Sequence, residues 1–492
     1  MNRRQFLQLS ALLAAGAATD SCAHLTPRYS RPQKLTLHDE RLLLNNASIV
    51  DVLQGQLIPD AAILIQGGRI LEILKQGQGQ TIRPDRELDL GGSYVLPGII
   101  NAHCHMCLSG GIGFGPGFLV AYKRQLERTA EECSKHGVTT VRDMLAVSDF
   151  LDELKAKIAR GEITGPRIIS CCGMDIKDSY GDRMTFFRKE RFWQEVNNPD
   201  EGRRAVTGAV DDGAEFIKLF QQPRELFLPG KELPLMDLET VLAIREEAAR
   251  HGKIVALHHS TVSGLTKALA AGVTSLEHMS TDTPVPEAEI RRLIDGNHVV
   301  VPTATVAFAL SYERRGDPNW GKGFSLRIAQ ERVKVMPGLI REFCEPELVN
   351  STLRFYRKLS DPDSFESWHL VPWPDPSVMN AASNVGSLNT KALYEAGVTF
   401  GCGNDGGVPL AFAGAMGVEM VLLEEQGLKT ADLLKMATIN NARLLQMDHE
   451  IGTVEKGKIA DLAIFEKNPL ATARNTLSAK MVFQAGQLVF RA

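Results

Sequence analysis

The chain has 492 residues, a formal net charge of −4, 44% hydrophobic residues and 23% charged residues. This length can bury a large core and allows one long barrel or several domains. The charge balance gives no support to a nucleic-acid partner, which would favour a clustered basic surface. No apolar run approaches the roughly 20 residues that a membrane-spanning helix needs, so no stable membrane span is expected.

Residues 1–23 have the layout of an export signal. Arg3 and Arg4 precede a short apolar stretch that ends in small residues near Ala23, which is typical of secretory signals. The order Arg-Arg-x-Phe-Leu is similar to twin-arginine signals, which export folded proteins. We therefore expect an exported, periplasmic protein. One alternative is a lipid attached at Cys22, although the residues before it fit a lipobox poorly, and another is an amphipathic start without signal function.

Both ends of the remaining chain have strand character. Residues 35–95 alternate apolar and polar positions between glycine turns, for example at Gly55 and Gly67, and such alternation is typical of half-buried strands. The same alternation of apolar and polar positions with glycine turns returns in residues 451–465 and 479–490. We expect residues 35–95 and 445–492 to form a small accessory β-sandwich domain together.

Between these flanks, in residues 96–444, short apolar runs alternate with helical patterns. Continuous apolar strands that alternate with helices predict a parallel sheet covered on both faces, and eight such strands close a TIM-type (β/α)8 barrel. The first run ends at His103, and the others span residues 137–143, 166–171, 215–220, 253–258, 273–278, 298–303 and 398–402.

Residues 307–390 form an insertion that is far longer than a normal connection between barrel elements. It contains a helical pattern from about Ser325 to Leu359. Excursions of this kind often serve as lids or binding loops, and the alternative is a surface or oligomer-contact insertion. The eight cysteines show no paired Cys-x-x-Cys spacing, and several lie in apolar runs, so neither a cysteine zinc site nor a disulfide framework is expected.

The first candidate site residues are two histidines at the end of the first barrel strand. Residues two apart in a strand point to the same side, so His103 and His105 project together while Cys104 faces the other way. Two neutral imidazoles at this spacing can bind one first-row metal ion. Alone, the pair is weak evidence for a metal site.

Other strand ends strengthen the metal interpretation. His258, His278 and Asp405 each close an apolar run, and Lys218 lies at the end of the fourth strand. The functional residues of TIM barrels cluster at this rim and come from different strands. A single histidine here would more often be a buried core residue, but the set predicts a metal site.

The motifs around these residues resemble those of the amidohydrolase superfamily. Leu96-Pro-Gly-Ile-Ile-Asn-Ala-His-Cys-His105 resembles its opening motif, and the resemblance extends over roughly residues 40–490. Further segments are similar to its imidazolonepropionase-like and Xaa-Pro dipeptidase-like branch or to its closing segment: residues 139–143, 216–218, 270–278, 437–443 and 457–463.

The resemblance implies a centre of two divalent metal ions, with zinc as the expected metal. His103, His105 and Asp405 would bind the more buried ion. His258 and His278 would bind the second ion. Metals lower the pKa of bound water toward about 7 and polarise the scissile carbonyl. Asp405 would carry the proton from the nucleophile to the leaving amine.

The resemblance also implies that Lys218 is carboxylated by carbon dioxide and bridges the two ions, with a hydroxide as the other bridge. An ammonium beside two cations would be repelled, whereas a carbamate supplies two anionic oxygens. The alternative is an unmodified Lys218 that binds substrate beside a mononuclear site.

The sequence departs from the family pattern in three places. At the fifth strand the family often has His-x-His, and this chain has His258-His259. The interval from His258 to His278 matches the family, so His258 is the expected ligand and His259 has a core or supporting role. Residues 220–224 replace a glycine-rich continuation, and Asn404 stands where threonine is usual. Both changes put the substrate pocket in doubt.

These features predict an enzyme that hydrolyses an amide bond in a small molecule, such as a dipeptide or an N-acyl amino acid, and we expect it to be a homo-oligomer. Hydrolysis of a lactone, carbamate or phosphotriester is the alternative, since the same nucleophile attacks many electrophiles. Mononuclear deamination or cyclic-amidine opening is disfavoured, because Thr261 stands where deaminases usually have glutamate. A catalytically silent barrel is disfavoured because all six ligands are kept.

Three arginines are candidates to bind a substrate carboxylate. Arg183, Arg188 and Arg224 lie in segments expected at the rim of the barrel. A solvated surface charge is the plainer interpretation of each.

Overall fold

The computed structural model describes residues 40–75, 83–108, 110–111, 118–145, 148–184, 191–224, 231–312, 323–360 and 376–492. The expected export signal, Cys22 included, lies outside these residues and stays a prediction. Among the helices that are described, none is long and apolar enough to cross a membrane.

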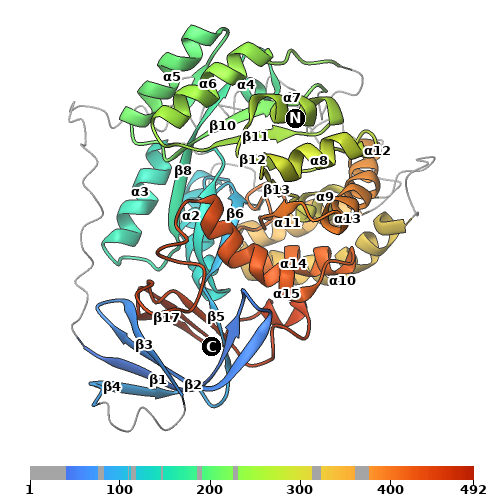
Figure 1. Ribbon diagram of the computed structural model, residues 1–492. Coiled ribbons are helices and arrows are strands. Elements are labelled where there is room, and N and C mark those ends of the chain that lie inside the picture. The colour runs from blue at the N-terminus through green and yellow to red at the C-terminus, as the bar shows by residue number, and fades with distance from the viewer. Residues whose placement is uncertain are drawn as a thin grey trace.

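Both chain ends contribute strands to one eight-stranded sheet, which lies at the bottom of Figure 1. The ends are joined where β5 pairs antiparallel with β15. Side chains including Leu44, Ile63 and Phe483 form a separate apolar core for this sheet. The prediction of an accessory β domain built from both chain ends is confirmed. Its strands are β1 (Leu42–Asp51), β2 (Gln56–Gln66), β3 (Arg69–Lys75), β4 (Arg86–Asp89), β5 (Tyr94–Pro97), β15 (Leu462–Phe465), β16 (Met481–Gln484) and β17 (Gln487–Arg491).

The second sheet is parallel and has the strand order β6-β7-β8-β10-β11-β12-β13-β14. A short strand, β9, pairs with β8 and adds a ninth strand to the eight that the sequence predicts. The strands are β6 (Ile99–Cys104), β7 (Val138–Asp143), β8 (Arg167–Asp175), β9 (Trp193–Glu195), β10 (Phe216–Gln221), β11 (Val255–His259), β12 (Ser275–Glu277), β13 (Val299–Val301) and β14 (Thr399–Phe400).

This sheet closes into a barrel where the segment after β14 meets β6. The Ala102 N–H donates to the Cys402 carbonyl at 3.0 Å, and the Asp405 N–H donates to the His103 carbonyl at 2.8 Å. The Asn441 side-chain amide donates to the carbonyls of Ile100 and Cys402, both at 2.7 Å, and so ties the two segments together. The predicted TIM-type barrel is confirmed.

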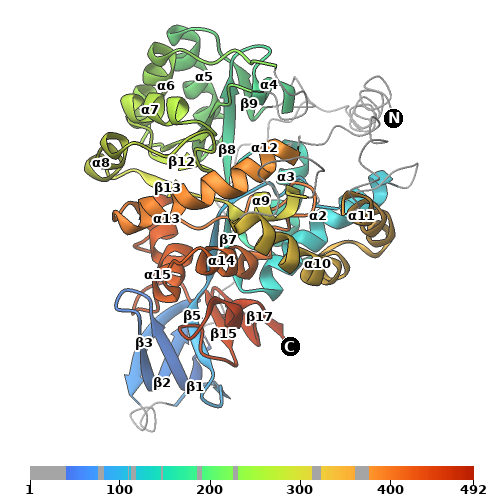
Figure 2. The same cartoon turned by 90° about the vertical axis from the view of Figure 1, so that its right-hand side faces the viewer.

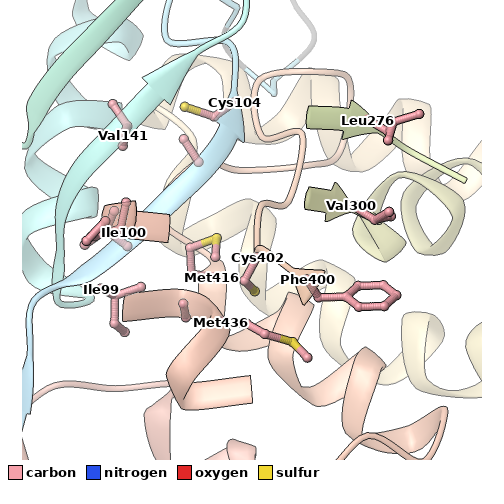
Figure 3. Close-up of a cluster of buried hydrophobic side chains, with 14 of the residues drawn as sticks. Ile99, Ile100, Cys104, Val141, Leu276, Val300, Phe400, Cys402, Met416 and Met436 are labelled. Carbon is pink, nitrogen blue, oxygen red and sulfur yellow. The ribbon is translucent and has the colours of Figure 1, made fainter. Parts of the chain in front are cut away.

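Apolar side chains pack around this closing seam (Figure 3). Ile99 and Ile100 of β6 belong to one buried cluster with Phe400 of β14 and with Cys104 and Cys402. Removing such side chains from water is the main favourable term in folding. Cys104 therefore points into the core, as expected for the residue between two histidines. The seven described cysteines are buried, and no disulfide forms among them.

Helices follow most strands and cover the outside of the barrel (Figure 1). Several begin with a side chain that accepts a backbone N–H, which stabilises a helix start. Thr261 does so for α7, where it accepts the Gly264 N–H at 3.1 Å. The helices are α2 (Phe118–Lys135), α3 (Ser148–Ala159), α4 (Tyr180–Met184), α5 (Pro199–Asp211), α6 (Leu238–Arg250), α7 (Val262–Ala271), α8 (Glu287–Asp295), α13 (Ser387–Glu395), α14 (Met416–Glu425), α15 (Thr430–Lys435) and α16 (Asn441–Leu444).

The chain between β13 and β14 contains α9 (Ala304–Leu310), α10 (Gly323–Phe343), α11 (Pro346–Leu359) and α12 (Pro376–Ala381) before α13. The single helical pattern expected from Ser325 to Leu359 is two helices, because Pro346 lacks an N–H donor and disfavours helical backbone at the residue before it. In Figure 2, α10 and α11 lie beside α2. Their apolar side chains share a core with Phe412, in the loop that follows Asp405.

Candidate metal centre

All six predicted ligands lie near the carboxyl ends of the barrel strands. His103 is in β6 and His258 in β11, and His278 directly follows β12. Lys218 is deeper than the sequence suggests. It is an interior residue of β10 and pairs with Ala256, whereas the partner of His258 is Phe220, two residues later. The prediction that Lys218 ends its strand is wrong, because β10 continues to Gln221.

Three of these residues form a compact cluster. Ligand atoms of His103, His278 and Asp405 all lie within 4.8 Å of one another. The Asp405 Oδ1 atom is 3.3 Å from His103 Nε2 and 3.0 Å from His105 Nε2. The structure thus brings His103, His105 and Asp405 together around one carboxylate oxygen, with His278 at their side.

Each of the four histidines predicted as ligands uses one ring nitrogen for a hydrogen bond to a residue that is not a predicted ligand. A neutral imidazole carries one N–H and one lone pair. A bond to an acceptor therefore places the N–H on that nitrogen and leaves the lone pair on the other, an assignment that the hydrogen-bond network supplies. The bonds are His103 Nδ1 to Glu277 Oε2 at 2.7 Å, His105 Nδ1 to the Leu145 carbonyl at 3.4 Å, His258 Nε2 to Gln222 Oε1 at 3.2 Å and His278 Nδ1 to Thr303 Oγ1 at 2.7 Å.

These bonds leave lone pairs on His103 Nε2 and His105 Nε2, the two atoms that face Asp405. The Asp405 Oδ1 atom is itself buried and accepts no hydrogen bond from the described residues. Buried acceptors normally have a donor. Three acceptor atoms that face one another without a donor are a set that suits a divalent cation, so the residues present fit a metal ion.

Electrostatics favour an anionic Asp405. Burial would raise the pKa of its carboxyl, but the positive charge that His103 and His105 carry when they are protonated outweighs burial and holds this pKa well below its usual range. Asp405 in turn raises the pKa of His105, and a bound cation would take the place of the protons on these rings. Burial and neighbouring charged groups hold the pKa of His258 and of His278 well below the usual value for histidine. The carboxylate is therefore anionic and these two imidazoles are neutral.

Glu277 and Arg142 support the cluster and were missed from the sequence. Glu277 accepts from His103 through Oε2 and from Arg142 Nη2 at 2.7 Å through Oε1. Both side chains are fully buried. Burial raises the pKa of the Glu277 carboxyl, but Arg142 and His103 reverse that effect and keep it low. A carboxylate behind a ligand histidine fixes the ring and raises its basicity. The sequence does contain a signal for these two residues. Each is a charged residue within an apolar strand, β12 for Glu277 and β7 for Arg142, and a buried charge needs a partner.

Lys218 is buried beside these groups, and its ammonium lies 5.4 Å from the centroid of the Phe220 ring. Burial lowers its pKa from 10.5 to about 8, although the Glu277 carboxylate acts in the opposite direction. Its charge also acts on the pKa of His258 and of His278. Lys218 therefore interacts electrostatically with both histidines and is easier to deprotonate than an ordinary lysine.

The second predicted pair is His258 and His278. Their ring centroids are 4.5 Å apart in an edge-on arrangement, and His258 also contacts the stacked ring of Tyr180 at 4.9 Å and the tilted ring of Phe220 at 5.9 Å. His258 is not part of the three-residue cluster. His259 is buried and bonds the Glu277 carbonyl through Nδ1 at 3.1 Å, so it supports β12.

Asn404, the residue that stands where the family usually has threonine, is fully buried and uses its side chain for hydrogen bonds within the barrel. Its Oδ1 atom accepts from Asn101 Nδ2 at 2.8 Å and from the Gly406 N–H at 3.0 Å, and its Nδ2 atom donates to the Phe412 carbonyl. Asp405 has a left-handed backbone with φ of 50°, which is costly for a residue other than glycine. The buried hydrogen bond between Asn101 and Asn404 lies next to Asp405 and holds its backbone in place.

Of the three candidate arginines, the structure describes the side chain of Arg224 alone. Arg224 is exposed and lies in a short bridge with Glu232. The side chain of Arg183 and the whole of Arg188 lie outside the part of the chain that the structure describes.

Comparisons with known proteins agree with this fold. The model of the family described as "Amidohydrolase family" matches residues 94–489. This range contains the whole barrel and the C-terminal strands of the accessory domain. The chain therefore belongs to the amidohydrolase family.

Individual proteins match the chain over shorter segments than the family model does. An imidazolonepropionase from Pseudomonas putida (strain GB-1) is 30% identical over 155 residues, which are 30% of this chain and 36% of that enzyme. An allantoinase from Enterococcus faecalis (strain ATCC 700802 / V583) is 33% identical over 105 residues, 21% of this chain and 20% of that enzyme. The chain thus spans little more than a third of these relatives at most.

The fold is shared over a much larger part of the chain. A crystal structure of a Xaa-Pro dipeptidase with bound methionine in its active site superposes with a TM-score of 0.70 at 22% identity, and it covers 92% of this chain and 100% of its own. At this identity the likeness establishes the architecture alone.

Proposed function

We propose that the protein is a metal-dependent amidohydrolase that cleaves the C–N bond of a small amide, of the dipeptide or N-acyl amino acid type. The observation that carries the proposal is the buried Asp405 oxygen that faces two histidine lone pairs without a donor. Membership of the amidohydrolase family supports it. The fold shared with a Xaa-Pro dipeptidase is in keeping with a dipeptide-like substrate.

In this proposal His103, His105 and Asp405 would hold one divalent ion, and His258 and His278 would hold a second. Lys218, which is buried and interacts electrostatically with both histidines, would join the two as a carbamate. When bound, such ions, which we expect to be zinc, lower the pKa of water and polarise the substrate carbonyl.

The chain's own contribution to the reaction is a proton acceptor at Asp405. Its low pKa means that it begins as an anion, which a general base requires. Asp405 would take a proton from the attacking water as the oxygen–carbon bond forms. It would return that proton to the amine nitrogen as the C–N bond breaks. The products are a carboxylic acid and an amine, so protons and bonds balance.

The pKa of Lys218 leads to a testable pH dependence. Only the neutral amine attacks carbon dioxide, and the resulting carbamate releases one proton. With a pKa of about 8 rather than 10.5, roughly a tenth of Lys218 is neutral at pH 7, against well under a thousandth for an unshifted lysine. Metal-free enzyme incubated with zinc and dissolved carbon dioxide should therefore regain activity faster as pH rises, with the increase levelling off above about 8.

This dependence is measured as the initial rate of reactivation at a fixed concentration of dissolved carbon dioxide, with all samples assayed at one common pH. A reactivation rate that does not change between pH 6 and 9, or that needs no carbon dioxide, would contradict the carbamate.

The substrate class is tested by screening purified enzyme, reconstituted with zinc and bicarbonate, against N-acyl amino acids and dipeptides. Lactones, carbamates, phosphotriesters and cyclic amidines belong in the same screen. The proposal expects amide hydrolysis that chelation abolishes and zinc restores. Turnover limited to cyclic amidines, or amide hydrolysis that survives chelation, would refute it.

A further inference from the structure

We propose that Gln222 orients His258 for the second metal ion, so that the ion is bound through Nδ1 of that imidazole. The inference rests on the proposed two-ion centre and concerns a segment that departs from the family pattern. Gln222 directly follows β10 and is 4% exposed. It is a positioning residue in this proposal and touches the ligand, not the ion.

The amide of Gln222 is fixed in one orientation. Its Nε2 atom donates to the Arg224 carbonyl at 2.9 Å, which turns the Oε1 atom toward His258 Nε2 at 3.2 Å. An amide oxygen can only accept a hydrogen bond. His258 Nε2 must therefore carry the proton, and the lone pair lies on Nδ1.

Other neighbours fix the plane of the ring but not the choice of nitrogen. The Tyr180 ring stacks on His258 with 23° between the planes, and His278 meets it edge-on at 69°. Ring contacts of this kind leave both tautomers open, the one with Nδ1–H and the one with Nε2–H. The Gln222 oxygen selects the Nε2–H tautomer because it can only accept a hydrogen bond.

Gln222 also links the two halves of the proposed site. The strand that carries Lys218 ends one residue before Gln222, and Phe220 in this strand pairs with His258. One rigid segment thus places the proposed bridging lysine and selects the nitrogen of the second-ion ligand. A glycine-rich segment after β10, as in the family pattern, would have no side chain to select the nitrogen of His258.

The partners of the two sites differ in charge. His103 is held by the Glu277 carboxylate, and His258 by a neutral amide. An anionic partner raises the basicity of a ligand histidine more than a neutral one does. His258 is therefore expected to be the less basic of these two ligand histidines.

The test compares full-length wild-type protein with Gln222→Leu, Gln222→Glu and a matched control, Gln221→Leu. Gln221 is the neighbouring glutamine, fully buried, but it bonds Lys267 and the Met236 carbonyl. Stepwise Co²⁺ dissociation constants are measured by competition with a chelator, and folding by thermal unfolding.

We expect Gln222→Leu to weaken the second Co²⁺ site about 10- to 100-fold and to leave the first unchanged. Gln222→Glu should restore or tighten the second site. Gln221→Leu should lower the unfolding temperature while both dissociation constants stay at the wild-type values. Wild-type constants in Gln222→Leu would overturn the proposal.

A second readout needs neither metal nor activity. Histidine-selective ¹⁵N NMR of the metal-free protein reports which ring nitrogen carries the proton, and the His258 signal is identified by its loss in His258→Asn. We expect Nε2–H in the wild type and a mixture of tautomers in Gln222→Leu. A wild-type Nδ1–H tautomer would overturn the role of Gln222 alone, whereas wild-type protein that binds one ion would overturn the two-ion centre.

Discussion

Asp405→Asn is expected to lower kcat/KM by about 10²- to 10⁴-fold, the range typical of losing a general acid–base group. Asparagine has nearly the same shape, and the left-handed backbone is one that it tolerates, so the fold should persist. The amide cannot accept the proton that Asp405 would carry. It also removes the negative charge that faces His103 and His105.

Steady-state kinetics, metal content and thermal unfolding measured on one preparation separate these effects. Asp175→Asn is the matched control, because Asp175 is another buried carboxyl at a strand end, and burial raises its pKa to about 7. A group that is already half protonated near neutral pH should tolerate the amide with a small kinetic change. An Asp405→Asn variant that keeps more than about a tenth of wild-type kcat/KM would exclude the proton-transfer role.

Lys218→Ala is the second change with a large expected effect. It should cost the second ion and about 10²-fold or more in kcat, comparable to removing one strong electrostatic contact from an active site. Without the carbamate no anionic group would remain between the two proposed ion positions. Metal analysis and kcat are the measurements, and a short carboxylate such as formate or propionate in the buffer should restore part of both.

Lys267→Ala provides the control for this variant. Lys267 is a partly buried lysine of α7 that bonds Gln221 and the Met236 carbonyl rather than the metal ligands. The substitution Lys267→Ala should affect the stability of the fold more than the metal content of the protein. Full occupancy of both ion sites in Lys218→Ala would show that Lys218 is not a bridging ligand.

The barrel and the positions of its candidate ligands follow from local sequence. Apolar runs of strand length mark the strands, and the polar residues that close them at His103, His258 and His278 mark the rim. The ninth strand, β9, is three residues long, too short for a pattern to identify. The expectation that Lys218 ends its strand rests on the tendency of a charged residue to follow an apolar run, whereas β10 continues to Gln221 and buries this lysine.

The supporting residues could not be read from the sequence, because they act on distant segments. Glu277 precedes His278 but bonds His103, 174 residues away in the chain. Gln222 reaches His258 in the neighbouring strand, and Asn404 closes onto Asn101 across the seam of the barrel. Each of these contacts depends on which strands are neighbours and on side-chain direction, neither of which the local pattern specifies.

The central claim, a hydrolase that works through a two-ion centre, is tested most directly by metal content and amide hydrolysis measured on the same protein. After expression with zinc and bicarbonate we predict about two ions per chain, with activity falling in parallel as a chelator removes them. Fewer than about one ion per chain, or full activity in the metal-free protein, would contradict the claim.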